Sequence, residues 1–209
     1  MKVHKIRKDL FTENLVSGKT VYGERLMRRS GRELRSWDPR RSKLAAAIKK
    51  GMDFDLKEDA NVLYLGTSSG TTASHISDMI PQGMLFGVEF APRVAREFIL
   101  LSFERHNLVP ILASANNPDD YFFIPECDLL YQDVAQPNQV QIFLKNMRYL
   151  KEGGLGFLAV KSRSINVSEN PEKIFRKVLS ELKKHVEILD KRNLSPFEKD
   201  HLAILVKKT

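Results

Sequence analysis

The sequence predicts an α/β protein with a doubly wound, mostly parallel sheet, preceded by a small β-rich unit. Two patterns support this prediction. From about residue 60 onward, short apolar runs alternate with helix-forming stretches, which is typical of βαβ units. Before residue 40, short β-type stretches are separated by Gly18, Gly23 and Gly31, which is typical of antiparallel strands and turns. We therefore expect a small basic N-terminal β domain with a linking helix at residues 1–54 and a main domain at residues 55–209.

Three short strands and one helix are expected in the N-terminal unit. The strands are expected at Lys2–Ile6, Lys19–Tyr22 and Leu34–Trp37. Asp38-Pro39 then predicts the start of a helix, because Asp is a preferred N-cap and Pro is tolerated at the first helical position. Leu44 to Ile48 continue this helix, which carries Lys43, and Gly51 ends it.

Seven strands and four helices are expected in the main domain. The strands are expected at residues 62–65, 84–89, 109–113, 128–133, 155–161, 186–190 and 202–206, and the helices at about 71–80, 92–106, 137–150 and 172–184. Gly153-Gly154 is expected to end the third helix before the fifth strand begins. The last two strands have no helix between them, so we expect an antiparallel pair at one edge of the sheet.

Ligands of such sheets bind beyond the carboxyl ends of the parallel strands. This rule directs attention to the residues at which the expected strands end, namely Gly66, Glu89, Ala113, Asp133 and Lys161.

Composition excludes several classes of protein. The 209 residues are 42% hydrophobic and 29% charged, which is ordinary for a globular protein with a real core. A single cysteine, Cys127, excludes a disulfide framework and a cysteine-based metal cluster, and the five histidines show no metal-ligand spacing. Met1 to Leu10 lack the apolar core of a secretory signal, and no run approaches the roughly 20 apolar residues of a membrane span. We therefore expect a cytoplasmic protein that binds neither a metal nor a membrane.

Positive charge is concentrated near the N-terminus. The chain carries 34 Lys and Arg against 26 Asp and Glu, a net charge of +8. Residues 1–51 carry a net charge of +10 and residues 52–209 a net charge of −2. Seven arginines fall within seventeen residues: Arg25, Arg28, Arg29, Arg32, Arg35, Arg40 and Arg41. Since Arg suits bidentate contact with phosphate, the pattern favours nucleic acid as a partner over a merely solvated basic surface.

The loop Gly66–Thr72 and Glu89 together suggest an adenosine cofactor. Gly66 and Gly70 allow a tight turn, but the loop is neither G-x-G-x-x-G nor a Walker A motif. Glu89 ends the second strand 23 residues after Gly66, where an acidic side chain can accept hydrogen bonds from both ribose hydroxyls. Nicotinamide dinucleotides and S-adenosylmethionine both use this arrangement, and the latter has no phosphate and tolerates the imperfect glycine pattern.

Asp133 and Lys161 end neighbouring strands and are expected to pair inside the cleft. Asp133 alone would fit a helix cap, and Lys161 alone would fit a side chain that reaches solvent. A Lys that ends a buried strand beside a carboxylate favours the pair instead. His75 is expected to pack inside the fold, and the aromatic side chains of Trp37, Phe122 and Phe123 are expected in the core.

Six segments, in order along the chain, carry a resemblance to a known family. They are Trp37-Asp38-Pro39-Arg40-Arg41-Ser42-Lys43-Leu44-Ala45-Ala46-Ala47-Ile48, Ser69-Gly70-Thr71-Thr72, Val88-Glu89-Phe90-Ala91-Pro92-Arg93, Asp133-Val134-Ala135-Gln136-Pro137, Lys161-Ser162-Arg163-Ser164-Ile165 and Pro196-Phe197-Glu198-Lys199-Asp200-His201. Together they resemble the signatures of fibrillarin, a family of RNA 2′-O-methyltransferases. The chain has no Gly/Arg-rich nucleolar extension and looks like the archaeal form.

The resemblance implies a Rossmann-like S-adenosylmethionine-dependent methyltransferase fold with a mostly parallel seven-stranded sheet, an antiparallel last strand and a small N-terminal β-rich domain. It implies 2′-O-methylation of rRNA, and possibly tRNA, by the catalytic subunit of a box C/D ribonucleoprotein. The implied partners are a box C/D guide RNA, the target rRNA, a Nop-family scaffold protein and a kink-turn-binding ribosomal-like protein.

Site residues follow from the matching segments. The implied catalytic residues are Lys43, Asp133, Lys161 and His201, with Asp200 as the other choice for the fourth position. The implied cofactor contacts are Gly66, Thr71, Thr72, Glu89, Phe90, Ser114, Ala115, Asp133, Val134, Ala135 and Gln136. The family commonly has Asp where this chain has Ser114, so an adenine contact is weaker here unless Asn116 or Asn117 compensates.

Lys161 is expected to relieve the ribose 2′-hydroxyl of its proton, and Asp133 to position Lys161 and the methyl donor. Lys43 is expected to hold the adjoining phosphate or sugar. Three other functions stay open from the sequence. They are a non-catalytic RNA-binding subunit with a degenerate methyltransferase fold, a methyltransferase of small molecules or proteins, and a nicotinamide oxidoreductase.

Overall fold

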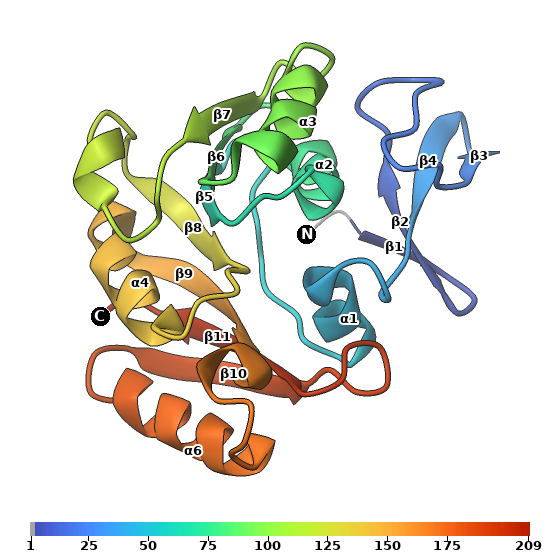
Figure 1. Ribbon diagram of the computed structural model, residues 1–209. Coiled ribbons are helices and arrows are strands. Elements are labelled where there is room, and N and C mark those ends of the chain that lie inside the picture. The colour runs from blue at the N-terminus through green and yellow to red at the C-terminus, as the bar shows by residue number, and fades with distance from the viewer. Residues whose placement is uncertain (1–2) are drawn as a thin grey trace.

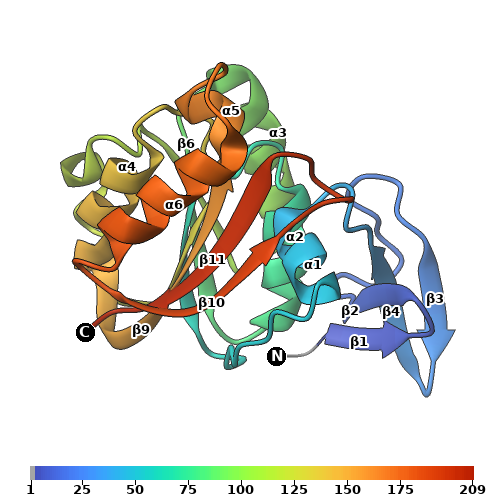
Figure 2. The same ribbon diagram turned by 90° about the horizontal axis from the view of Figure 1, so that it is seen from below.

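The computed structural model describes residues 3–209, so Lys2 of the first expected strand lies outside the described residues. These residues form two sheets, one of four strands and one of seven. Figure 1 shows helices α1 (Lys43–Lys49) and α2 (Thr71–Met79) lying between the two sheets, and Figure 2 shows the same arrangement from below. The α/β class and the small β-rich unit are confirmed, whereas a domain boundary at residue 54 stays a prediction.

The small sheet is antiparallel throughout, with strand order β1-β2-β4-β3. Its strands are β1 (Val3–Ile6), β2 (Asp9–Glu13), β3 (Leu26–Arg29) and β4 (Arg32–Trp37). The expected strand at Lys19–Tyr22 is wrong. The Glu24 carboxylate accepts hydrogen bonds from the backbone N–H groups of Val21 and Tyr22, which fold this segment into a turn. The sequence reading also missed β2 and β3.

Helix α1 begins four residues later than expected, at Lys43 rather than at Pro39. Asp38 does not cap it, because its carboxylate accepts from the Arg40 N–H and its carbonyl from the Arg41 N–H, which closes a separate turn. Ser42 is the N-cap, and its hydroxyl accepts from the Ala45 N–H. Lys43 is therefore the first residue of the helix.

The large sheet has the order β10-β11-β9-β8-β5-β6-β7. Its strands are β5 (Asn61–Leu65), β6 (Met84–Glu89), β7 (Leu108–Leu112), β8 (Cys127–Gln132), β9 (Leu150–Lys161), β10 (Glu187–Asn193) and β11 (His201–Lys207). Strand β11 runs antiparallel to both β9 and β10, so the expected antiparallel pair at one edge is confirmed. Strand β9 starts at Leu150, and Gly153-Gly154 lies inside it rather than before it, because both glycines bond to the backbone of Lys208.

Helices cover both faces of the large sheet and bury two apolar cores. The remaining helices are α3 (Pro92–Ser102), α4 (Gln139–Asn146), α5 (Ser162–Ile165), α6 (Pro171–Leu182) and the 3₁₀ turns η1 (Pro118–Tyr121) and η2 (Met147–Tyr149). Trp37 is buried as expected, but Phe122 and Phe123 are 79% and 59% exposed, so their expected place in the core is wrong. Both follow η1, where the chain turns along the surface.

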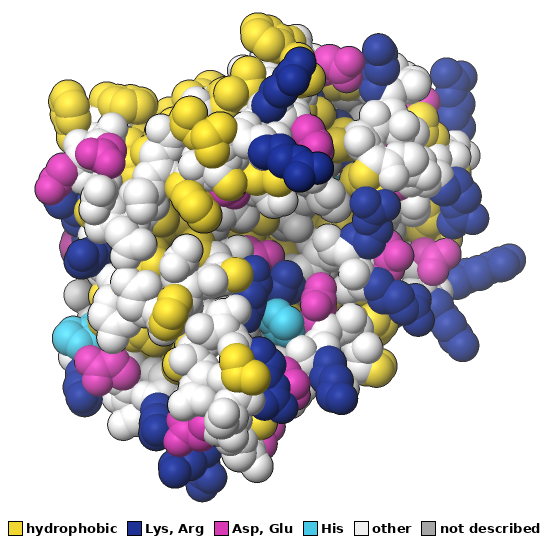
Figure 3. All heavy atoms as spheres, viewed as in Figure 1, with side chains coloured by type: hydrophobic (Ala, Val, Ile, Leu, Met, Phe, Trp, Pro, Cys, Tyr) yellow, Lys and Arg dark blue, Asp and Glu magenta, His cyan; other side chains and the backbone are white. Residues whose placement is uncertain are grey.

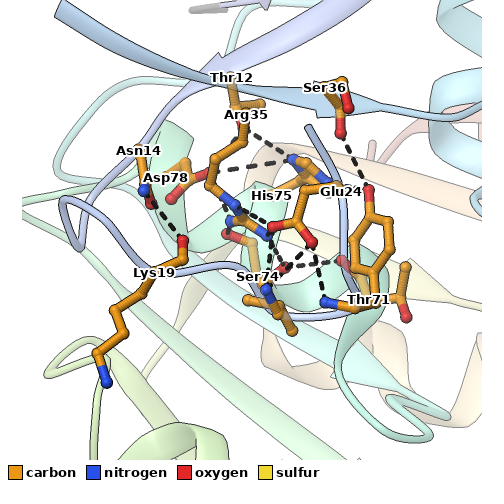
Figure 4. Close-up of polar contacts among 12 residues, drawn as sticks. Thr12, Asn14, Lys19, Glu24, Arg35, Ser36, Thr71, Ser74, His75 and Asp78 are labelled. Atoms are coloured by element: carbon orange, nitrogen blue, oxygen red, sulfur yellow. Dashed lines mark hydrogen bonds and ion pairs between the residues drawn. The ribbon is translucent and has the colours of Figure 1, made fainter. Parts of the chain in front are cut away.

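A buried ionic network joins the small sheet to α2 (Figure 4). Arg35 of β4 points toward Glu24, Ser74 and Asp78, with 2.6 Å between its Nε and the Glu24 carboxylate and 2.8 Å between its Nη1 and Asp78. Asp78 also accepts from Arg105 at 2.7 Å. Arg35 is fully buried, so counting it among the arginines available to a polyanion is wrong.

His75 lies in the same network as a neutral ring. The Thr12 hydroxyl donates its one proton to Asp78, so it accepts from Nδ1 of His75 at 2.7 Å, and the Tyr22 hydroxyl lies 2.7 Å from Nε2. Burial, followed by the charge of Arg35, holds the pKa of His75 well below its ordinary value. The ring stacks on Trp37 with 4.8 Å between centroids, which confirms the expected packing role of His75.

Candidate active site

A cavity of about 490 Å³ lies where the parallel strands β6, β5, β8 and β9 end. Most of the expected site residues line it: Gly66, Glu89, Phe90, Ser114, Ala115, Asp133, Val134, Ala135, Gln136 and Lys161. Gly66 has a φ of +82°, and a Cβ at this position would lie 2.8 Å from the Asp133 carbonyl oxygen. The glycine therefore lets the loop after β5 pass directly against the loop after β8.

At one end of this site, Asp133 lies between two lysines. Lys161 Nζ is 2.9 Å from Oδ1 of Asp133 and 3.2 Å from its carbonyl oxygen, and Lys43 Nζ is 3.2 Å from Oδ2. All three side chains are less than one fifth exposed. The expected Lys161–Asp133 pair is confirmed, and the helix cap is excluded because Asn138 occupies the N-cap of α4. Opposite charges at these distances hold the two ammonium groups on either side of one carboxylate.

His201 pairs with Lys161 across the β9–β11 ladder and is partly buried. Its Nδ1 lies 2.6 Å from the Lys199 carbonyl oxygen and donates to it, which leaves Nε2 as an acceptor. Burial is the main cause that lowers the pKa of His201, and the Lys43 ammonium adds to it. Asp200, the other choice for this position, instead accepts from Arg163 at 2.9 Å.

Glu89 is buried and its carboxylate is oriented by the backbone. Oε2 accepts from the Ser68 N–H at 2.9 Å and Oε1 from the Ala91 N–H at 3.0 Å. Each carboxylate oxygen has two lone pairs, so both oxygens can accept a further hydrogen bond from a ligand in the cavity. Ser68 adopts a φ of +52° in this loop.

Ser114 lines the cavity beside Asn116, whose amide oxygen accepts from the Asn138 side chain. The Ser114 hydroxyl accepts from the Asn116 N–H at 3.3 Å. Asn116 is thus the neighbour placed to supplement Ser114, whereas Asn117 precedes η1 and does not line the cavity. Phe90 lies at the mouth of the cavity and is 63% exposed.

Thr71 and Thr72 lie apart from this cavity. Thr71 lines a separate hollow beside α3. Thr72 is buried, and its hydroxyl donates to the Ser42 hydroxyl at 3.0 Å. The hydrogen bond therefore links the first turn of α2 to the cap of α1, which carries Lys43.

Sequence reasoning missed two residues of the site. Ser68 lines the cavity, and Glu198 lies 3.8 Å from Lys43 Nζ. Glu198 belongs to the quoted segment Pro196–His201, and Ser68 to the quoted loop, so proximity to the motifs was the available signal. Lys43 and Glu198 are brought together only by the packing of α1 on the turn before β11.

Within residues 3–209 no helix is both long enough and apolar enough to cross a membrane. In the same range, no three His, Cys, Asp or Glu side chains gather as metal ligands would. The expectation that the protein holds no metal stays a prediction. Cys127 is buried, and burial raises the pKa of its thiol to about 12.

Three solved structures resemble this chain over nearly its whole length. The Methanococcus jannaschii fibrillarin pre-rRNA processing protein superposes with a TM-score of 0.93 at 39% identity, covering 99% of this chain and 97% of that one. Aeropyrum pernix fibrillarin in complex with natively bound S-adenosyl-L-methionine superposes with a TM-score of 0.88 at 43% identity, covering 98% and 92%. A fibrillarin/Nop5p complex has a chain that matches with a TM-score of 0.93 at 37% identity, covering 100% and 98%.

Sequence comparison agrees with the structural one. The chain is 50% identical over 202 residues to the fibrillarin-like rRNA/tRNA 2′-O-methyltransferase of Pyrococcus horikoshii, covering 95% of this chain and 89% of that protein. It is 46% identical over 212 residues to the Methanosarcina mazei protein of the same name, covering 99% and 93%. The fibrillarin family model matches residues 1–209. This chain therefore belongs to the fibrillarin family.

Proposed function

We propose that this chain is an S-adenosylmethionine-dependent 2′-O-methyltransferase of rRNA and tRNA and the catalytic subunit of a box C/D guide ribonucleoprotein. The observation that carries the proposal is the arrangement of Lys43, Asp133 and Lys161 beside a cavity of the size of an adenosine-containing ligand. Relatives at about 50% identity are named for this reaction, and the Aeropyrum pernix relative holds S-adenosylmethionine.

The described residues fit the cofactor. Glu89 offers two backbone-oriented carboxylate oxygens to the ribose hydroxyls. We assign the adenine end to Phe90, Ser114 and Ala115, and the methionine end to residues 133–136, where the Asp133 charge favours a cation. Thr71 and Thr72 would act on the cofactor through the loop, because neither lines the cavity. When bound, S-adenosylmethionine supplies an electrophilic methyl group.

The mechanism needs one ribose oxygen aligned with that methyl group and relieved of its proton. The Lys161 ammonium would first release a proton to solvent, and the resulting amine would accept the 2′-hydroxyl proton as the oxygen–carbon bond forms. Asp133, 2.9 Å away, would then stabilise the resulting ammonium. Lys43, at the first residue of α1, would hold the neighbouring phosphate or sugar. His201, kept neutral by burial and by Lys43, would add no positive charge beside the reacting oxygen.

Guide RNA, target RNA, a Nop-family scaffold protein and a kink-turn-binding protein are the partners that we propose, in a cytoplasmic particle. The scaffold is supported by the complex of a relative with Nop5p. One surface of this chain suits a protein partner. Apolar side chains of α3, of its C-cap Phe103 and of the edge strand β7 are exposed there: Leu100 is 57% exposed, Phe103 81% and Leu112 58%. In Figure 3, yellow side chains gather along the upper part of the view, over these elements.

Reconstitution with the scaffold, the kink-turn protein and a guide RNA tests the proposed reaction. We expect methylation at the guided nucleotide, and a rate about 10² to 10⁴ times lower in Lys161→Ala. Lys161→Arg keeps the positive charge but cannot accept a proton, so we expect the same loss.

Titration calorimetry with S-adenosylmethionine provides the control, because Lys161→Arg should bind the cofactor nearly as the wild type does. A wild-type chain that neither binds the cofactor nor methylates RNA would favour the non-catalytic RNA-binding subunit. Full activity in Lys161→Arg would contradict the role given to Lys161.

A further inference from the structure

A second hollow lies between the small sheet and α1, outside the cofactor cavity. We call it the basic groove. It has a volume of about 560 Å³. Four cationic side chains line it, from Lys8, Arg25, Arg40 and Lys49, together with Trp37, Phe197 and the carboxylates of Asp9 and Asp38.

We propose that the basic groove binds backbone phosphates of the RNA strand that enters the active site. The inference rests on the proposed function and adds to it a location for the flanking nucleotides. Its ligand is the ribose–phosphate backbone, recognised by charge rather than by base sequence.

The cations of the basic groove are only partly neutralised. The Arg40 guanidinium has no partner among the described residues, and Lys49 Nζ donates to the Lys8 carbonyl rather than to a carboxylate. Arg25 Nη2 lies 3.4 Å from the Asp9 carboxylate, but both side chains are more than 60% exposed. This ion pair therefore contributes little free energy, and Arg25 can bind a phosphate in place of Asp9. The carboxylate of Asp38 accepts from the Arg40 backbone N–H and is used in the turn.

Trp37 is a buried residue in the wall of the basic groove. Its side chain lines the basic groove and is 1% exposed, yet its indole Nε1–H has no acceptor within the described part of the chain. An indole N–H is a donor only and normally has a partner when it is buried. Trp37 therefore lies beside any ligand of the basic groove, where its fluorescence can respond to binding.

Two chain segments that line the basic groove continue into residues of the active site. The turn that carries Arg40 continues into Ser42 and Lys43, and Phe197 is followed by Glu198, which lies 3.8 Å from Lys43 Nζ. In Figure 3, dark-blue side chains gather on the side of the small sheet, to the right of the view, and continue toward the centre. An acidic protein segment would also meet these charges, but continuity with Lys43 favours the strand that carries the substrate ribose.

The test compares two variants from which equal charge has been removed, in the reconstituted guide particle. Arg40→Ala/Lys49→Ala removes two groove cations, and Arg176→Ala/Lys183→Ala removes two exposed cations, one in the middle of α6 and one at its C-cap. For the groove variant we expect the KM for target RNA to rise about tenfold, and the slope of log KM against log salt to fall by about 1 to 2. The rate at saturating RNA should stay within about twofold, and the α6 variant should match the wild type.

Trp37 is the only tryptophan, so its fluorescence reports on the groove without any methylation. We expect a short oligouridylate to change this fluorescence in the wild-type chain, with a weaker apparent affinity in the groove variant.

The fluorescence readout separates the two proposals. If the reconstituted particle is inactive but the oligouridylate still changes the fluorescence as expected, only the proposed function is overturned. An active particle with an unchanged KM and salt slope in the groove variant would overturn the RNA groove. A groove variant that loses the scaffold protein but keeps its RNA affinity would assign the groove to an acidic protein segment and overturn it as well.

Discussion

Ser114 is the residue at which this chain departs most clearly from the pattern it resembles. A hydroxyl accepts a hydrogen bond less strongly than an ionised carboxylate does. The Ser114 hydroxyl is also shared with the Asn116 N–H at 3.3 Å. In the proposed cofactor arrangement, the adenine end of the cavity therefore has a weaker acceptor than the buried, backbone-oriented Glu89 at the ribose end.

We predict that Ser114→Asp binds S-adenosylmethionine about five to ten times more tightly, because a charged acceptor adds roughly 1 kcal/mol over a neutral one. Titration calorimetry measures the difference. Ser168→Asp, on an exposed loop, is the matched control and should leave the affinity unchanged. An unchanged affinity in Ser114→Asp would place the adenine away from this position.

Two histidines make the stability of the fold sensitive to acid. Both His75 and His201 have a pKa lowered mainly by burial, so the unfolded chain binds their protons more readily than the folded one. Each therefore lowers the free energy of unfolding as the pH falls below about 6.5, the ordinary value for histidine.

We predict a loss of up to about 1.4 kcal/mol per pH unit for each of these histidines below pH 6.5, until its folded pKa is reached. Urea unfolding at pH 7, 6 and 5 measures the slope. His75→Gln should flatten the slope even if it is less stable at pH 7. His106→Gln, with an exposed ring, should retain the slope of the wild type, and equal slopes in all three chains would refute the assignment.

Helix α1 shows how one short element carries a functional side chain. Its seven residues are too few to be stable alone, so its position depends on its cap and on burial. The Ser42 hydroxyl accepts from the Ala45 N–H at 3.3 Å and from the Thr72 hydroxyl at 3.0 Å. One side chain thus fixes the start of α1, and with it Lys43, to the first turn of α2.

We predict that Ser42→Ala lowers the free energy of unfolding by about 1 to 2 kcal/mol, because the helix loses its cap and Thr72 loses an acceptor. The displacement of Lys43 should lower the guided methylation rate about tenfold, with little change in cofactor affinity. Ser42→Thr keeps the hydroxyl and should restore both properties. A wild-type rate in Ser42→Ala would mean that α1 is positioned by packing alone.

At the level of the whole molecule, the buried network around Arg35 joins the small sheet to the cofactor-binding part. The Asp78 carboxylate lies 2.8 Å from Nη1 of Arg35 and 2.7 Å from Nη1 of Arg105, and all three side chains are almost completely buried. Removing one member leaves charges buried without a partner, which costs more than an exposed pair ever contributes.

We predict that Arg35→Ala lowers the free energy of unfolding by about 3 to 5 kcal/mol. Arg28→Ala, on an exposed strand of the same sheet, should change it by no more than about 0.5 kcal/mol. Urea unfolding followed by circular dichroism measures both. Similar effects in the two variants would show that the network contributes no more than a surface charge does.

Local patterns in the sequence were sufficient to predict the alternation of strands and helices and the antiparallel edge pair. They also predicted that four residues align at one end of the sheet: Gly66, Glu89, Asp133 and Lys161. This follows because apolar periodicity and strand ends are properties of neighbouring residues, and parallel strands bring their carboxyl ends to one edge. The start of α1 was misplaced because Asp38-Pro39 and Ser42 are competing caps whose choice depends on contacts outside the segment.

Long-range packing determines the side-chain partners and the burial that the sequence alone did not predict. Lys43 and Asp133 are separated by 90 positions and meet only because α1 packs against the sheet. Arg35 and Arg40 look alike in the sequence, yet one is buried against Asp78 and the other lines the basic groove. The neighbouring residues in the sequence do not determine which group a charged side chain pairs with, or whether that side chain is buried. Both depend on which distant surfaces the folded chain brings together.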